Sequence, residues 1–420
     1  MSGTSLLDDR GSSERLAGRT FRRFFRRTFR TILRRTFRTT SGRLARGLAP
    51  AIAFSAASLA LTGPALAAPI PVTSCGQSLA SDGVLTGNLD CTGLSGPGVH
   101  LQRGTRLDLN GFTLSGGDGD GVVCDDSCRV RSEVPGGTIA DFAGHGVVAR
   151  AVIDDKAAVA VSRVTVRDNG GHGVFADGAG GRTGANRSII SGNGGAGLYS
   201  PDKARVVATT VSGNAAQGLR AANVNLSGSE FSGNDVGVES LVIARIYACQ
   251  FTDNIGDGVR ATNAIKAKEL ESLRNGGSGL VLDTIDRLAK IVYSEISDNG
   301  LDGVTAIGEH GNLSRFKFVF IRRNGRNGIT SDNFRVVVSR VDDNAFHGVY
   351  AAPGGRCAVR VDRFSIIGNG TDPSCGVSTP CADIASCAEL VRFGAETKCN
   401  TSYDTASGFP GTSWGVCSAD

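Results

Sequence analysis

The sequence predicts an all-β protein, a parallel β-helix that winds into a solenoid of about twelve rungs. Two observations predict it. A phrase such as RDNGGHGV, SGNGGAGL or TDNIGDGV recurs every 20 to 25 residues, and apolar residues keep fixed positions around each phrase. A period of this length is typical of stacked repeats. Ten asparagines mark the phrases: Asn169, Asn193, Asn214, Asn234, Asn254, Asn275, Asn299, Asn324, Asn344 and Asn369.

Each rung is predicted to hold three short strands. Apolar residues stand eight and three positions before most of the asparagines and five positions after them, as Val161, Val166 and Val174 do around Asn169. Apolar positions that alternate with polar ones between turns indicate strands. A helical pattern of about 10–15 residues is missing from every repeat, which argues against helical and leucine-rich solenoids.

The asparagines are predicted to be structural. In a coil that repeats every turn, an inward Asn side chain can hydrogen-bond the Asn of the next rung and satisfy backbone groups at a bend. Asn also tolerates left-handed backbone angles, and the Gly four residues later does so more freely. We therefore expect an asparagine ladder whose members have no catalytic role.

Residues 1–67 are predicted to be an export signal. Residues 1–47 hold thirteen Arg and three acids, and the uncharged, Ala-rich stretch 48–67 ends in Ala-Leu-Ala. A basic segment, an apolar segment and a small-residue site are typical of a cleaved signal. The repeated Arg-Arg-x-Phe resembles a twin-arginine signal, and Sec export, an organelle transit peptide and a retained anchor are the alternatives. We expect a periplasmic or extracellular protein with no membrane span in the mature chain.

The mature chain differs in charge from the whole sequence. The formal net charge is +5, and the first 67 residues carry +10, so residues 68–420 carry −5. A basic isoelectric point therefore gives no support to nucleic-acid binding, and no nucleic-acid partner is predicted.

Eleven cysteines indicate an exported protein with disulfides. Cys75 with Cys91, and Cys124 with Cys128, are the natural local pairs, whereas Cys249 falls in an apolar position and is expected to be a buried free thiol. The spacing of Cys375, Cys381 and Cys387 does not fit a zinc site, and neither a metal nor a cofactor is predicted. Six more cysteines crowd the end of the chain: Cys357, Cys375, Cys381, Cys387, Cys399 and Cys417.

The open ends of a solenoid need caps, because unpaired strand edges promote aggregation. The cysteine-rich segments outside the repeat fit that role. The predicted organisation is an export signal (1–67), an N-terminal cap (68–104), the parallel β-helix (105–370) and a Cys-rich, disulfide-tied C-terminal cap (371–420).

The Asn-x-x-x-Gly-Val rungs, with the lead-in Leu107-Asp108-Leu109-Asn110-Gly111, resemble the right-handed parallel β-helix family with the pectin-lyase-like fold. The resemblance covers about residues 100–370. It implies that fold, and it implies polysaccharides, often acidic ones, as ligands along the outside of the first sheet. It does not imply one activity, because the fold hosts lyases, hydrolases, epimerases and adhesins.

Enzyme signatures of that family are mostly missing. His145 and His172 stand in Gly-His-Gly as in polygalacturonases, but the Asn-Thr-Asp and Arg-Ile-Lys elements that should accompany it do not occur. The Asp-Pro-His-Glu signature of alginate-type epimerases is also absent. His145, His172 and His347 precede the Gly of the repeat, where other rungs have Ala, Gln, Asp, Ser or Asn, and we expect a solvent-facing turn position.

The residues nine before each Asn are predicted to point outward from the first strand of each rung. Seven of the ten are basic, although Lys and Arg make up only 32 of the 353 residues after the signal. Tyr247, Lys268 and Lys317, two places along, share the same face. The ten are Ala160, Gly184, Arg205, Asn225, Arg245, Lys266, Lys290, Arg315, Arg335 and Arg360.

Two explanations of these cations are open. Acids on the next strand or in the third turn could neutralise them: Glu230, Glu271, Glu295, Asp283, Asp286 and Glu309. Otherwise the cations are used, and a ladder of Arg and Lys suits the regularly spaced charges of a uronate or sulfated glycan. The predicted ligand contacts are Arg205, Arg245, Lys266, Lys290, Arg315, Lys317, Arg335 and Arg360.

The leading hypothesis is an exported β-helix protein that binds an acidic polysaccharide. One alternative is a lyase or epimerase acting on uronate glycans, with Lys268, Arg315 and Tyr247 as candidate catalytic groups, and Lys266 and Lys290 beside them. A calcium-dependent lyase is disfavoured because only Asp362 is placed on this face. The other alternative is a structural surface or periplasmic spacer without a ligand.

Overall fold

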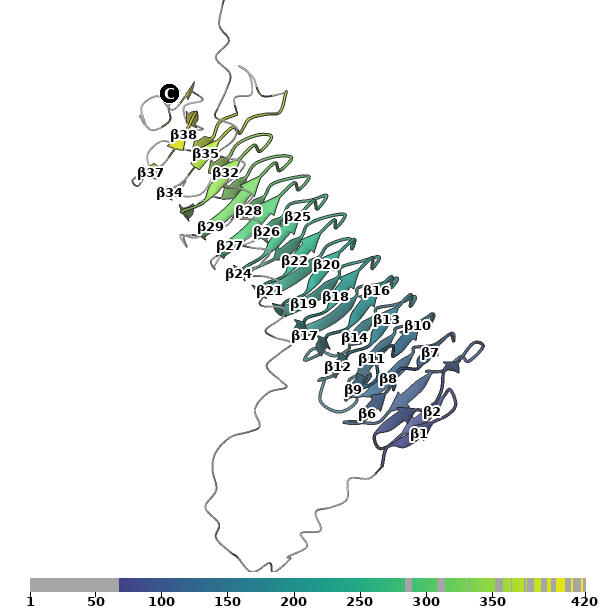
Figure 1. The fold of residues 1–420 in the computed structure, drawn as a ribbon. Coiled ribbons are helices and arrows are strands. Elements are labelled where there is room, and N and C mark those ends of the chain that lie inside the picture. Colours follow the sequence, from purple (N-terminus) through teal and green to yellow (C-terminus); the bar gives the residue numbers. More distant parts are fainter. Residues whose placement is uncertain are drawn as a thin grey trace, which may run out of the picture. The chain divides into compact units, whose positions relative to one another are not determined.

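The computed structural model describes residues 68–283, 289–307, 314–331, 333–351, 358–363, 365–373, 375, 381–386, 391–393, 398–404, 409–410 and 417. Within these ranges the chain is a coil of β-strands without a helix, so no helix there is long and apolar enough to cross a membrane (Figure 1). The predicted parallel β-helix of about twelve rungs is confirmed. The predicted export signal lies outside the described residues.

Each rung passes through three faces, and each strand pairs in parallel with its equivalent one rung away (Figure 1). Face 1 contains β1 (Ile70–Val72), β3 (Gly83–Leu85), β6 (Arg106–Asp108), β9 (Ser127–Arg131), β12 (Ala158–Ser162), β15 (Arg182–Asn186), β24 (Ala264–Lys268), β31 (Asn333–Val337), β34 (Ala358–Asp362) and β37 (Val391–Phe393). Face 2 contains β4 (Leu89–Asp90), β7 (Thr113–Ser115), β10 (Thr138–Ala140), β13 (Thr165–Arg167), β16 (Ile189–Ser191), β18 (Thr210–Ser212), β20 (Glu230–Ser232), β22 (Gln250–Thr252), β25 (Glu271–Leu273), β32 (Arg340–Asp342), β35 (Ser365–Ile367) and β38 (Lys398–Cys399).

Face 3 contains β2 (Gln77–Leu79), β5 (Val99–Leu101), β8 (Val122–Asp125), β11 (Val147–Arg150), β14 (Val174–Ala176), β23 (Val259–Ala261), β26 (Leu280–Asp283), β28 (Val304–Ile307), β30 (Ile329–Ser331), β33 (Val349–Ala351), β36 (Ile384–Ser386) and β39 (Ser402–Asp404). Beyond it, β40 (Phe409–Pro410) pairs antiparallel with β39.

Five longer strands turn a corner of the coil instead of stopping there. β17 (Leu198–Val207), β19 (Leu219–Ser227) and β21 (Val238–Tyr247) run from face 3 into face 1 of the next rung, with register shifts where β17 meets β19 and β19 meets β21. β27 (Lys290–Ser297) and β29 (Ser314–Arg322) run from face 1 into face 2.

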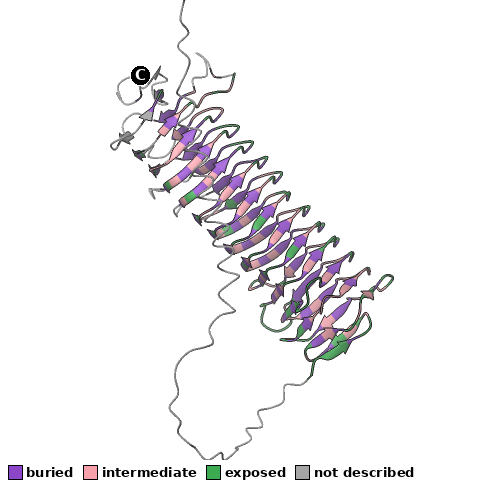
Figure 2. Cartoon of the chain, viewed as in Figure 1, coloured by how far each residue is buried: buried purple, intermediate pink, exposed green. Residues whose placement is uncertain are grey.

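The core lies inside the coil. Along most strands, buried side chains alternate with exposed or half-buried ones (Figure 2). Val161, Val166 and Val174, the apolar positions predicted for one rung, are all buried. The rung with Ser272 in such a position keeps its register, because Ser272 pairs with Phe251 and Ile296 and its hydroxyl donates to the Gly279 carbonyl at 2.9 Å.

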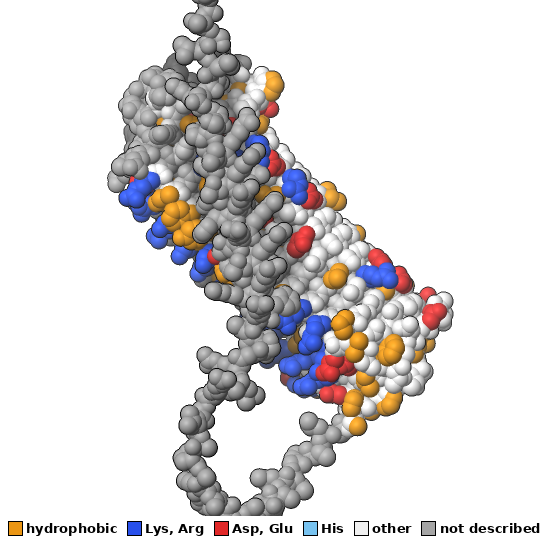
Figure 3. Space-filling view, in the orientation of Figure 1, with side chains coloured by type: hydrophobic (Ala, Val, Ile, Leu, Met, Phe, Trp, Pro, Cys, Tyr) orange, Lys and Arg blue, Asp and Glu red, His pale blue; other side chains and the backbone are white. Residues whose placement is uncertain are grey.

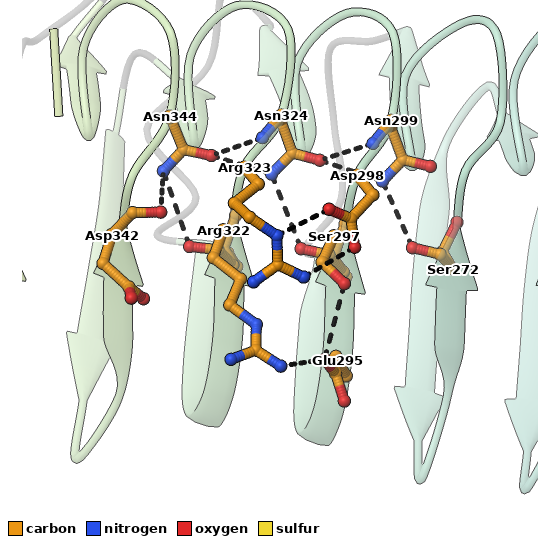
Figure 4. A network of polar contacts seen from close by, with 12 residues as sticks. Ser272, Glu295, Ser297, Asp298, Asn299, Arg322, Arg323, Asn324, Asp342 and Asn344 are labelled. Atoms are coloured by element: carbon orange, nitrogen blue, oxygen red, sulfur yellow. Dashed lines mark hydrogen bonds and ion pairs between the residues drawn. The ribbon is translucent and has the colours of Figure 1, made fainter. Parts of the chain in front are cut away.

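The predicted asparagine ladder is confirmed. Each Asn side chain donates from Nδ2 to Oδ1 of the Asn one rung on, at 2.8–3.2 Å from Asn169 through Asn344, and Asp383 accepts from Asn369 at 2.9 Å. Each Oδ1 also accepts a backbone N–H, as Asn324 Oδ1 does from Asn299 (Figure 4). Every amide in the row is therefore satisfied by its neighbours.

The left-handed residue of this turn precedes the Asn, which corrects the sequence expectation. Asp168, Asp253 and Asp298 have φ of 55°, 57° and 61°. The Gly four residues after each Asn is needed for a different reason, because the backbones of successive rungs approach each other closely there. A Cβ on Gly173 would lie 2.7 Å from the Gly197 carbonyl oxygen of the next rung.

A second ladder, which the sequence analysis did not predict, lines the corner between faces 1 and 2. Hydroxyl groups there each donate to a carbonyl two residues earlier, as Ser229 does to Ser227 at 3.1 Å, and accept a backbone N–H of the preceding rung, as from Thr209 at 3.2 Å. Cys249 occupies one of these positions and its thiol donates to the Tyr247 carbonyl at 3.2 Å. It is the buried free thiol that was predicted, and burial raises its pKa to about 11.

Disulfides join both predicted local pairs, Cys75–Cys91 and Cys124–Cys128. Cys375–Cys381 and Cys399–Cys417 lie near the end of the chain, while Cys357 and Cys387 lie outside the described residues. β1 to β5 pair onto the same faces as the repeats, so residues 70–101 continue the coil. The division into two caps and a β-helix stays a prediction. Disulfides at both ends agree with an oxidising compartment.

Candidate functional site

The predicted cations stand in register on face 1. The Cα partners run one per rung through Gly184, Arg205, Asn225, Arg245, Lys266, Lys290, Arg315, Arg335 and Arg360. We call the seven cations among them the basic row. Their strand neighbours, such as Ile246 and Ile291, are buried, and the cations are exposed. In Figure 3, Lys and Arg side chains gather at the upper part of one long edge of the coil.

No member of the basic row forms an ion pair in the part of the chain that the structure describes, and the same holds for Lys317. Rungs repeat about every 4.8 Å, and two unit charges at that distance repel by about 1 kcal/mol in water. The row from Arg245 to Arg360 holds six cations in succession.

Three of the six acids expected to neutralise the row have partners elsewhere. Glu295 pairs with Arg322 at 2.7 Å on the outside of face 2, Glu271 accepts from Gln250 at 2.8 Å, and Asp283 lies 3.9 Å from Arg260 (Figure 4 shows the first pair). Glu230 belongs to β20 on face 2, around the corner from the row. Asp286 and Glu309 lie outside the described residues.

A second row, two residues along face 1, mixes cations with aromatic rings. Tyr247, Lys268, Val292 and Lys317 are in register, one per rung. The Lys268 Nζ atom lies 5.4 Å from the centroid of the Tyr247 ring, and Lys317 Nζ lies 5.0 Å from that of Phe318. Both contacts are cation–π in geometry.

Two more rings stand at the adjoining corner, where the sequence analysis placed none. Tyr293 and Phe318 stack with centroids 4.9 Å apart and planes 7° apart. Both have positive φ, 53° and 55°, which is unusual for a bulky residue. Tyr293 is 45% exposed and Tyr247 40%. Face 1 therefore offers flat apolar surface beside its positive charge.

The candidate catalytic groups lie on this face but do not form an acid–base constellation. Lys268 Nζ lies 3.4 Å from Glu269 Oε1, and Arg315 is exposed within the basic row. Asp362 is in register with Val337, in the second row. Within the described ranges no group of three or more His, Cys, Asp or Glu side chains is arranged to hold a metal ion.

The histidines of the Gly-His-Gly phrases are acceptors in a third ladder, and they are half-buried where a solvent-facing position was expected. His145 Nδ1 accepts the His172 N–H at 2.8 Å, and His172 Nδ1 accepts the Ala196 N–H at 2.8 Å. The two rings stack at 5.1 Å, with Tyr199 beyond. Burial, and then His145, lower the pKa of His172 to about 4. His347 Nδ1 likewise accepts the Ala382 N–H at 3.0 Å.

No protein-family model matches this chain, and neither does any curated protein sequence. Among solved structures, the chain is similar to the periplasmic alginate epimerase AlgG, with 14% identity, a TM-score of 0.45, and 71% of this chain and 76% of that chain covered. It is also similar to the A-module of the Azotobacter vinelandii mannuronan C-5 epimerase AlgE6 (14%, TM-score 0.27, 73% and 80% covered). A third is pectate lyase Pel9A (14%, TM-score 0.24, 79% and 80%). The likeness is one of fold.

Proposed function

We propose that the mature chain is an exported protein that binds a linear acidic polysaccharide along face 1. The observation that carries the proposal is the basic row: seven exposed cations in register, none of which forms an ion pair with another described residue. A repulsive row is stabilised when an external anion lies along it. The ligand that fits is a chain whose own charges repeat at a similar interval.

The chemistry of face 1 suits a uronate or sulfated glycan. Guanidinium groups match carboxylate and sulfate oxygens through paired N–H donors, and ammonium groups add point charges. The rings of Tyr247, Tyr293 and Phe318 supply apolar surface for sugar faces beside those charges. A chain lying along the coil axis would contact one cation per rung, so its affinity is spread over many weak contacts.

Processing of the same glycan is the second function to test, because face 1 carries part of what a lyase needs. Elimination requires charge neutralisation at the carboxylate, a base for the C5 proton and an acid for the leaving oxygen. Cations supply the first requirement, and Tyr247 beside Lys268 is the hydroxyl group nearest to them in the second row. New absorbance at the wavelength of unsaturated uronates reports this activity.

The test uses residues 68–420 and measures retention on polyuronate, sulfated-glycan and neutral-glycan matrices, with absorbance followed in parallel. We expect retention on the anionic matrices alone, falling steeply as salt rises. The variant Lys266→Ala/Lys290→Ala/Arg315→Ala should lose about 100-fold or more in affinity, at about 1 kcal/mol or more per charge-assisted contact.

The matched control removes three cations from other places, Arg150→Ala/Arg167→Ala/Arg274→Ala, and so makes the same change in net charge. These three form ion pairs with Asp120, Asp168 and Asp253. Affinity should fall by less than about threefold. Equal losses of affinity in both variants would show that binding depends on net charge and not on the basic row. If the wild type is retained on no anionic matrix, the proposal is overturned.

A further inference from the structure

A depression lies on face 1 before the basic row begins. It has a volume of about 440 Å³ and is lined by residues of β6, β9, β12 and β15. Ala158, Ala160 and Gly184 line it without long side chains, and Arg106, Arg129 and Arg182 are the charged residues of its lining. A volume of this size falls within the range of about 300–1,000 Å³ that is typical of small-molecule sites.

The depression interrupts a row of cations that continues on both sides. Register on face 1 runs Arg106, Arg129, Ala160, Gly184 and Arg205, one residue per rung. Two rungs without a long side chain therefore separate Arg129 from Arg205, a gap of about three rung intervals, or roughly 14 Å between their Cα atoms. In Figure 3, Lys and Arg side chains gather over β6 and β9, with acids beside them.

The arginines of this site differ in how far they are engaged. Neither Arg106 nor Arg129 forms an ion pair among the described residues, although they are direct partners in register. Arg182 pairs with Asp202 at 3.3 Å through Nε, and Lys203, in register with it, lies 3.7 Å from the same carboxylate. Two adjacent guanidinium groups without a counter-charge form a receptor for one carboxylate.

Packing does not require the small residues of the lining. A Cβ placed on Gly184 would meet the Ala160 Cβ at 3.6 Å, an ordinary contact, and Gly184 has no left-handed φ. Ala160 is also outward-facing and half-buried. A larger residue would therefore fit the fold at either position and would fill the depression.

We propose that this depression is a subsite for one sugar of the bound polysaccharide, a uronate whose carboxylate is held by Arg106 and Arg129. The ring lies over Ala158, Ala160 and Gly184, where long side chains would exclude it, and the next sugars continue onto the basic row from Arg205. This inference rests on the proposed function. It adds that face 1 holds one sugar ring in a shaped subsite, besides recognising a repeating charge.

The experiment compares short and long ligands on residues 68–420. Uronate trisaccharides, from both mannuronate and galacturonate series, and the parent polymers are titrated by calorimetry. We expect Ala160→Leu and Gly184→Val, which fill the depression, and Arg129→Gln, which removes one guanidinium, to weaken trisaccharide binding tenfold or more. Polymer affinity should change less than threefold, because the basic row remains.

Two controls separate the outcomes. Ala215→Val places the same side chain at an exposed position in the turn after Asn214, away from face 1, and trisaccharide binding should be unchanged. Unfolding midpoints of all variants show whether the coil is intact. Unchanged trisaccharide affinity in the filled variants, with polymer binding retained, would overturn the subsite and leave the proposed function standing. Failure of the wild type to bind any polymer would overturn both.

Discussion

The asparagine ladder and the basic row repeat along the same coil at the same interval, but they treat polarity in opposite ways. An amide carries both donors and an acceptor, so each Asn satisfies the next and the row closes on itself inside the protein. A cation has only donors, so Lys266, Lys290 and Arg315 cannot satisfy one another. A stacked row of identical groups thus satisfies itself when the group is self-complementary, and depends on other groups for neutralisation when it is not.

The largest effect should come from breaking the self-complementary row. Asn254 makes four hydrogen bonds: its Oδ1 accepts the backbone N–H of Asn234 at 3.1 Å and Asn234 Nδ2 at 3.2 Å, and its Nδ2 donates to Asn275 Oδ1 at 2.8 Å and to the Phe231 carbonyl at 3.2 Å. Asn254→Ala removes these four hydrogen bonds from the interior and leaves the Asn234 backbone N–H without its acceptor, and we expect a loss of about 3–5 kcal/mol in the free energy of unfolding. Denaturant titration measures it.

The control for that prediction is Asn225→Ala, the same substitution on the exposed outside of face 1. Its free energy of unfolding should change by less than about 0.5 kcal/mol. Equal losses at both positions would show that the ladder hydrogen bonds are not what the coil depends on.

The histidine ladder tests the same idea through pH. His172 must be neutral at Nδ1 to accept the Ala196 N–H, and its pKa is lowered to about 4 in the folded chain from 6.5 in the unfolded chain. Because the unfolded chain then binds the proton first, the contribution of His172 is complete above pH 6.5 and is lost as pH falls toward 4.

His172→Asn supplies an acceptor that does not titrate, as Asn327 does for His347 at 3.0 Å in another rung. We expect the fall in free energy of unfolding between pH 7.5 and pH 4.5 to be smaller in the variant by about 2 kcal/mol. An identical fall in the wild type and the variant would show that His172 does not contribute to the loss of stability in acid. His145, whose pKa is also lowered chiefly by burial, would still contribute.

The smallest expected effect is the change in free energy of unfolding when one cation is replaced by an acid. Its sign should differ between a cation with an ion-pair partner and one without. Lys290→Glu places an acid between Lys266 and Arg315 and should raise the free energy of unfolding by about 0.5–1 kcal/mol at low salt. Arg274→Glu, by contrast, sets an acid against Asp253, with which Arg274 now pairs at 2.7 Å, and should lower it. Both differences should shrink in high salt, and a destabilising Lys290→Glu would mean that the row is neutralised from within.

The period of the sequence was enough to predict the faces, the ladder and the basic row, because a repeat that fixes one residue per rung fixes the register of every other. Partners across a corner could not be predicted in this way. Glu295 was placed near the basic row by its position in the repeat, but it points from face 2 toward Arg322. The stacking of Tyr293 on Phe318 and the depression at Ala160 and Gly184 depend on side-chain positions that occur in only two rungs each.

The hydroxyl ladder could have been found, since Ser188, Thr209, Ser229, Ser294 and Ser339 share one position five before an Asn, and Cys249 stands in the same position. That signal was hidden because the position alternates between polar and apolar residues. Small polar residues in an otherwise apolar column are the pattern to look for.

The asparagine ladder also bears on the chemical lifetime of the chain. Six of its members are followed directly by glycine, the pairing in which the next backbone nitrogen most easily attacks the side-chain carbonyl and expels ammonia. In the folded coil both atoms are held: the Gly276 N–H donates to the Asn254 carbonyl at 2.8 Å, and Asn275 Oδ1 accepts from Asn254. Unfolding frees them, and each deamidation would set a carboxylate into the interior row. Folding thus protects the asparagines on which refolding depends, and deamidation while the chain is unfolded damages it irreversibly.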